Sequence, residues 1–291
     1  MSDTIATYTF LPWLRQGIAN KIDPAIATQS RATVQVKLKV TGKALEGADL
    51  EQEIIRNVEL YGPGDIIGID TKAIVKNEPR NWITNFESNY MPYVEFYDED
   101  FPWRYSPSVV QPNDRLTPWM ALVILKEDEF KEGTNMINRP LNFIEATDAD
   151  ATFPPADQLW AWAHVHANES LIDGEDNIVA DGGAEIDGVI SELNSLLNKN
   201  PDLAYSRIVC PRKLEPNTPY HAFLVPSYES GRLAGLGLNP QTTPNVESSA
   251  WEAYGGKLDA ALHPYYHRWY FRTGTVGDFE YLVRLLEPKP V

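Results

Sequence analysis

The sequence contains one cysteine, Cys210, among its 291 residues. A single cysteine excludes a disulfide within the chain and is typical of proteins in a reducing compartment. No stretch approaches the roughly 20 consecutive apolar residues that a membrane-spanning helix needs. The N-terminal segment MSDTIATYTFLPWLRQ lacks the basic region and apolar run that mark a secretory signal. We therefore expect a cytoplasmic protein with no membrane-inserted segment.

Positive charge is also scarce, since 25 Lys and Arg stand against 41 Asp and Glu, for a net charge of −16. Nucleic acid and anionic lipid surfaces repel such a chain, so neither is an expected partner. Between Arg139 and Lys199 there is no Lys or Arg, while twelve acids occur there. Such a belt is usually a solvated face, and the alternative is a docking face for a basic neighbour. Its candidate interaction residues lie in an acidic loop near 173–184: Asp173, Glu175, Asp176 and Asp181.

The common catalytic signatures are missing. There is no phosphate-binding G-x-x-x-x-G-K-[ST], no nucleophile G-x-S-x-G and no zinc-binding H-E-x-x-H. Cys210 follows an apolar segment, which is typical of a small buried side chain rather than of a nucleophile. The sequence therefore predicts a protein that is not an enzyme and that needs no cofactor.

Two histidines are candidates for a metal site, which would be an exception to this prediction. His164 and His166 lie in the segment WAWAHVHAN, and on a strand this spacing directs both rings to one side. A metal site needs a third ligand, which the spacing does not supply. We interpret the pair as packed and hydrogen-bonded beside Trp160 and Trp162. A metal-dependent hydrolase using His164 and His166 remains an alternative, as does a carbohydrate-binding module using exposed tryptophans.

Hydrophobic periodicity predicts many short strands and few helices. Residues 33–40 (TVQVKLKV) alternate cleanly between apolar and polar, and the continuous apolar run 119–125 predicts a strand buried on both faces. Residues 184–198 have helical spacing and end at Asn200-Pro201. We expect an α+β fold of mainly antiparallel sheet with a few short helices, in one large domain over 31–291. Further strands are expected at 53–61, 66–75, 90–97, 159–167, 206–210, 220–225 and 265–272, with helices near 228–234 and after 277.

The first 30 residues are expected to form an arm. Its apolar side chains are Phe10, Trp13, Leu14 and Ile18, and the segment is too short for a core of its own. It must lie on the domain or on another chain. We predict that these four are interaction residues and that Trp13 is buried mainly by another part of an assembly.

Five segments in order along about 60–291 carry a family resemblance. They are PYVEFYDEDFPWRYSP (92–107), LTPWMALVILKEDEF (116–130), WAWAHVHAN (160–168), RIVCPRKLEPNTPYHAFLVPSYESGRLAGLG (207–237) and YYHRWYFRTGTVGDFEYLVRLL (265–286). The chain resembles bacterial proteins encoded among the parts of phage-tail-like extracellular contractile injection systems. The resemblance implies a non-enzymatic structural component, at the baseplate, cap or spike surround. Its partners would be other subunits of the particle, in symmetric copies.

Overall fold

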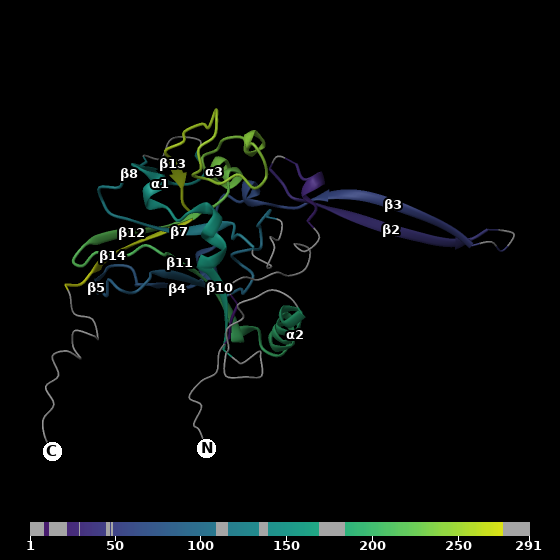
Figure 1. The fold of residues 1–291 in the computed structure, drawn as a ribbon, viewed down its shortest axis with the longest axis horizontal. Helices are drawn as coiled ribbons and strands as arrows, with labels where there is room; N and C mark the ends of the chain where they lie inside the picture. The colour runs from purple at the N-terminus through teal and green to yellow at the C-terminus, as the bar shows by residue number, and fades with distance from the viewer. Residues whose placement is uncertain are drawn as a thin grey trace, which may run out of the picture.

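The computed structural model describes residues 9–11, 22–28, 30–44, 47, 49–108, 116–133, 139–168 and 184–275. These residues form fourteen strands and three α-helices, joined by short 3-10 turns (Figure 1). The strands are β1 Thr9–Leu11, β2 Thr33–Lys43, β3 Asp49–Glu59, β4 Ile74–Glu78, β5 Ile83–Phe86, β6 Tyr93–Phe96, β7 Met120–Leu125, β8 Phe130–Glu132, β9 Phe143–Ala146, β10 Ala163–Ala167, β11 Ala204–Val209, β12 Pro219–Pro226, β13 Leu262–Pro264 and β14 His267–Thr273. The helices are α1 Ala149–Thr152, α2 Ala184–Lys199 and α3 Glu229–Gly235.

The strands form four sheets. A five-stranded sheet has the order β1-β10-β11-β6-β4, and a four-stranded sheet has the order β5-β14-β12-β7. A three-stranded sheet runs β13-β9-β8, and β2 and β3 form a hairpin of their own. The described pairs are antiparallel except β5 with β14, which is parallel. The predicted α+β fold of mainly antiparallel sheet is confirmed.

The four-stranded sheet lies at the centre of the body, with an apolar core on each of its faces. Along β7, Met120, Leu122 and Ile124 face the core shared with the five-stranded sheet. Ala121, Val123 and Leu125 face the second core, which includes β8 and β9. All six side chains are at most 2% exposed, so the prediction of a strand buried on both faces is confirmed. A continuous apolar run suits this position because successive side chains point to opposite faces.

Several predicted elements differ in their bounds. The segment 159–167 is a strand only from Ala163, because a 3-10 turn over Ala156–Trp162 precedes it. Of 66–75, only the last two residues are strand, since Asp70 accepts from Lys72 N–H and starts a 3-10 turn at Thr71–Ala73. The helices at 184–198 and 228–234 are confirmed as α2 and α3. The helix expected after 277 lies outside the described residues.

A buried ion pair fastens α3 to the loop that follows it. Glu229 and Arg232 are both fully buried, and two guanidinium nitrogens donate to the carboxylate at 2.7 and 2.6 Å. Arg232 also donates to the carbonyl oxygens of Leu258, Asp259 and Leu262. Tyr254 Oη donates to Glu229 at 2.7 Å. The residues 254–262 are thereby tied to the centre of the body by charge-assisted hydrogen bonds.

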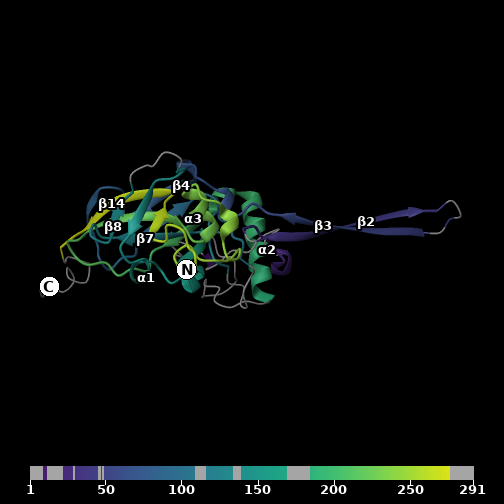
Figure 2. The ribbon, with the colours of Figure 1, turned by 90° about the horizontal axis from the view of Figure 1, so that it is seen from above.

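The hairpin of β2 and β3 extends away from the body in both views (Figures 1 and 2). Its strands pair over their full eleven residues, from Thr33 opposite Glu59 to Lys43 opposite Asp49. Only Thr33 and Val34, at its base, are buried. Among the described residues, no helix is long and apolar enough to cross a membrane.

Candidate functional site

The hairpin separates apolar and charged side chains onto opposite faces. Residues opposite each other on paired strands point to the same side, and successive residues alternate. One face therefore carries Val34, Val36, Leu38, Val40, Leu50, Ile54 and Val58, together with Gln52 and Arg56. The other face carries Lys37, Lys39, Lys43, Asp49, Glu51, Glu53 and Glu59, with Gln35, Asn57, Ile55 and threonines. We call the first set the apolar face of the hairpin and the second set its charged face.

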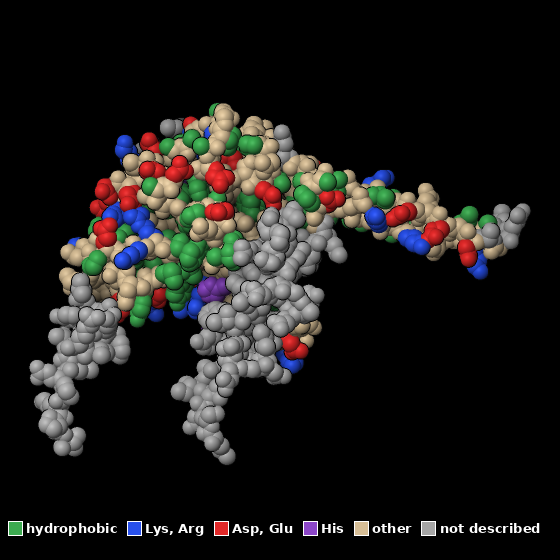
Figure 3. Space-filling model, viewed as in Figure 1, with side chains coloured by type: hydrophobic (Ala, Val, Ile, Leu, Met, Phe, Trp, Pro, Cys, Tyr) green, Lys and Arg blue, Asp and Glu red, His purple; other side chains and the backbone are tan. Residues whose placement is uncertain are grey.

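The apolar face is open to solvent. Leu38 is 58% exposed, Leu50 57% and Val36 48%. Figure 3 shows hydrophobic and charged side chains along the projecting hairpin, well away from the body. Contiguous exposed apolar patches on soluble proteins mark interaction sites, whereas scattered single residues do not. The apolar face is therefore the candidate contact surface of the described part of the chain.

The base of the hairpin is held to the body, which fixes its direction. Val34 is 2% exposed and pairs with Ile22, and Leu60 N–H donates to Ala32 O at 2.9 Å. Arg31 forms an ion pair with Asp65, whose carboxylate also accepts from Gly62 N–H at 3.0 Å. These contacts join the start of β2 to the turn after β3, so the hairpin leaves the body at a defined place.

Alternation in 33–40 predicted β2, but sequence reasoning missed the hairpin as a functional surface. The available signal was that Leu50, Ile54 and Val58 recur every fourth residue in β3, which places them on the same face as the apolar residues of β2. In an antiparallel sheet that packs on a core, this pattern would be buried. The structure shows no strand or helix of the described chain over the apolar face beyond its base.

The histidine pair lies on the five-stranded sheet. β10 places His164 opposite Arg207 and His166 opposite Tyr205, so both rings are on one side as predicted. The His166 ring stacks on Tyr205 with centroids 4.7 Å apart and planes at 12°. Arg207 Nε donates to Glu95 at 2.6 Å. Trp160 and Trp162, which were expected on the same strand face, lie instead in the preceding 3-10 turn.

The electrostatics around the pair disfavour positive charge. Burial, together with the charge of the Arg207 guanidinium, lowers the pKa of His164 to about 4. Burial and Arg207 also lower the pKa of His166. The neighbour that disfavours a proton here also disfavours a bound cation. Among the described residues, no group of three or more His, Cys, Asp or Glu is placed to hold a metal ion.

The remaining predicted interaction residues are only partly covered by the structure. Phe10 lies in β1, which pairs with β10 at the edge of the five-stranded sheet, opposite His166. Part of the predicted arm thus adds a strand to the sheet of this domain. Outside the described residues lie Trp13, Leu14, Ile18, Asp173, Glu175, Asp176 and Asp181.

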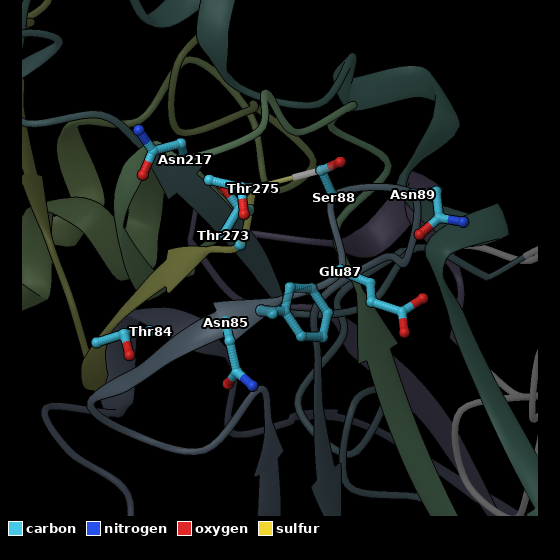
Figure 4. Close-up of a pocket in the computed structure, with 10 residues that line it drawn as sticks. Thr84, Asn85, Glu87, Ser88, Asn89, Asn217, Thr273 and Thr275 are labelled. Atoms are coloured by element: carbon cyan, nitrogen blue, oxygen red, sulfur yellow. The ribbon is translucent and has the colours of Figure 1, made fainter. Parts of the chain in front are cut away.

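A polar hollow of about 450 Å³ lies where β5 and β14 end (Figure 4). Its lining side chains are Thr84, Asn85, Phe86, Glu87, Ser88, Asn89, Asn217, Thr273 and Thr275, with Gly274. The lining contains one acid and no His, Lys, Arg or Cys. Hydroxyl and amide groups can form hydrogen bonds with a ligand, but a single carboxylate does not supply the acid and base pair that hydrolysis of a glycosidic bond requires.

Of the tryptophans that the structure describes, Trp82 is the most exposed, at 72%, and its ring lies 4.7 Å from that of Tyr270. Trp103, Trp119, Trp251 and Trp269 are at most 7% exposed. A carbohydrate-binding module binds sugars by stacking them on exposed aromatic rings. Among the described tryptophans, Trp82 offers such a ring.

Comparison with protein-family models, with curated proteins and with solved structures gives no match for this chain. Its function must therefore be inferred from its own residues and geometry.

Proposed function

We propose that the chain is a non-enzymatic structural subunit of a phage-tail-like contractile injection particle and that it acts through protein–protein contacts. The observation that carries the proposal is the apolar face of the hairpin, which projects from the body and is uncovered by the described chain. The resemblance of the five segments between 92 and 286 supports this type of particle.

An isolated two-stranded hairpin is at best marginally stable in water, because it has no core to pack against. This one has eleven residues in each strand, yet it places Leu38 and Leu50 in solvent with more than half of their surface exposed. Covering these side chains removes apolar area from water, at about 25 cal/mol per Å². A partner surface therefore stabilises both the hairpin and the complex.

The chemistry of the face indicates the kind of partner. A flat, ribbon-shaped apolar surface fits the apolar face of a sheet in another subunit, since sheets pack face to face about 10 Å apart. The net charge of −16 repels nucleic acid. The partner is thus a protein surface of the same particle.

The proposal is tested by replacing Val36, Leu38 and Ile54 with threonine in one variant. Threonine is β-branched, as Val36 and Ile54 are, and it adds a hydroxyl to the contact at all three positions. The tagged chain is expressed in cells that make the particle, and particles are isolated by sedimentation. The wild-type chain should sediment with the particles, and the variant should stay in the low-mass fraction.

The matched control replaces Gln35 and Asn57, which lie opposite each other on the charged face. Changed to threonine, they should leave incorporation intact. Tryptophan fluorescence of the purified variants should stay native, because the buried tryptophans Trp103 and Trp119 lie in the body. The proposal fails if the wild-type chain never sediments with particles, or if the apolar-face variant sediments equally well.

The two alternatives have weaker support. A metal-dependent hydrolase would have to bind a cation beside Arg207, without a third ligand among the described residues. A carbohydrate-binding module would rely on Trp82 with Tyr270.

A further inference from the structure

The two edges of the hairpin carry opposite charge. β2 contains Lys37, Lys39 and Lys43 and no acid. β3 contains Asp49, Glu51, Glu53 and Glu59 against the single cation Arg56. All three lysines and all four acids lie on the charged face, whereas Arg56 lies on the apolar face. The ribbon thus has one basic and one acidic strand.

Both strands also have a free edge in the described part of the chain. Among the described residues, β2 and β3 pair with each other and with no third strand, and Ile22 forms one further bridge to Val34 at the base. Beyond Val34, each strand therefore presents a row of backbone N–H and C=O groups that can pair with another strand. Charged side chains on an edge normally keep copies apart. In this hairpin, the lysines of β2 repel another basic edge and the acids of β3 repel another acidic edge, whereas a basic edge and an acidic edge attract each other.

We infer that the hairpins of neighbouring copies pair edge to edge, with β3 of one copy beside β2 of the next. The inference rests on the proposed function, and it names the occupant of the hairpin edges as a second copy of this chain. Hairpins that point the same way pair antiparallel in this arrangement, because β2 and β3 run in opposite directions. The lysines of one copy then lie beside the acids of its neighbour, on the same face of a continuous sheet.

The charges disfavour the two-fold alternative. A symmetric pair would place β2 beside β2, with three lysines against three lysines, or β3 beside β3, with four acids against four. Like charges opposite each other on adjacent strands are destabilising, whereas opposite charges are favourable. The contact is therefore head-to-tail, and head-to-tail contacts close into rings or continue as filaments.

The shape of the molecule places this contact toward the tip of the hairpin. Neighbouring strands lie about 4.8 Å apart, so paired hairpins are only about 10 Å from each other. The body is much wider than the ribbon in both views (Figures 1 and 2). Bodies can avoid each other only if the hairpins converge while the bodies fan outward, so the outer half of the ribbon is the contact.

The test uses the purified full chain without any other particle component. Thr41 of β2 and Glu51 of β3 lie opposite each other near the tip, on the charged face. One variant carries Thr41→Cys and another carries Glu51→Cys. The native Cys210 is 2% exposed, and burial raises its thiol pKa to about 11, so it contributes little to cross-linking. A bismaleimide is used that can reach a diagonal neighbour about 7–8 Å away.

The head-to-tail contact predicts covalent dimers in an equal mixture of the two variants, at least about tenfold above the level in either variant alone. A further variant has Lys37, Lys39 and Lys43 all changed to Glu in the Thr41→Cys chain. Mixed with Glu51→Cys, it should lose these dimers, because its β2 edge is then acidic like the β3 edge of its neighbour.

Dimers of Thr41→Cys alone, at the level of the mixture, would show a two-fold contact and overturn the inference. An absence of dimers in every sample, while the wild-type chain still enters particles, would overturn the edge contact and leave the proposed function standing.

Discussion

Mild acid should weaken the fold through His263, the most buried of the five histidines. His263 lies in β13, is 1% exposed, and packs against Phe153 with ring centroids 4.7 Å apart. Burial, together with the positive charges of Arg232 and Lys257, lowers its pKa to about 3. The folded protein therefore keeps this ring neutral at a pH where the unfolded chain protonates it.

The sign and size of the effect follow from the two pKa values. An unperturbed histidine titrates at about 6.5. Between about pH 6.5 and about pH 3 the unfolded chain binds a proton that the folded chain does not, so the free energy of unfolding falls as the pH falls. The stability that His263 contributes is fully present above the pKa of histidine in the unfolded chain. From about pH 7.5 to about pH 5, His263 should account for a loss of about 2 kcal/mol.

The assay compares urea unfolding of the wild-type chain and His263→Gln at both pH values, followed by tryptophan fluorescence. The other four histidines are unchanged, so their effects cancel in the difference between the two proteins. The stability difference should shift by about 2 kcal/mol in favour of the variant at the lower pH. An equal stability difference between the two proteins at both pH values would refute the prediction. If the variant does not fold, the ring protons of His263 can be followed by NMR in the wild-type protein. A pKa near 6.5 for His263 in the folded state would also refute the prediction.

Two further changes test the packing of the body. Glu229→Gln leaves Arg232 buried without its charge partner and should cost about 3–5 kcal/mol in urea unfolding, so a cost below about 1 kcal/mol would contradict the buried pair. Gly133→Ala brings a methyl group to 2.1 Å from the Phe143 ring and should cost about 1–3 kcal/mol by overpacking. Gly68→Ala is its control, because nothing lies within 4 Å of a Cβ there, and equal stabilities of the two variants would contradict the close contact.

The body could be predicted from the sequence where periodicity and burial agree. The run 119–125 is apolar throughout because both faces of β7 pack against a core. The helix α2 could be found because its apolar residues recur at helical spacing and Asn200-Pro201 follows it. In these segments the local pattern and the tertiary environment impose the same constraint.

The burial of the ion pair in α3 could not be predicted from the local sequence pattern. Glu229 and Arg232 are three apart on a short helix, a spacing that usually indicates a solvent-exposed ion pair. The structure buries both completely, because carbonyl oxygens of the loop 258–262 and Tyr254 complete their hydrogen bonds. Those partners come from a segment that no local pattern connects to the helix, so the burial could not be predicted.

The same limit applies to the hairpin. Alternation over 33–40 identifies the face of the strand that avoids water, but it does not say which chain covers that face. Val34 and Val40 belong to one apolar row, yet the first is 2% exposed and the second 47%. The difference arises because the body ends where the hairpin begins, and only a three-dimensional arrangement contains that information.

Size connects the two contacts proposed for the hairpin. Eleven residues per strand span about 36 Å, and two strands are about 10 Å wide, so one apolar face offers about 350 Å². Stable interfaces bury about 800 Å² on each partner, which one hairpin does not reach. Two or three hairpins that pair along their outer halves together offer an apolar area of that size. Loss of the edge contact should therefore also weaken binding at the face, whereas loss of the face should leave the edge contact between purified copies intact.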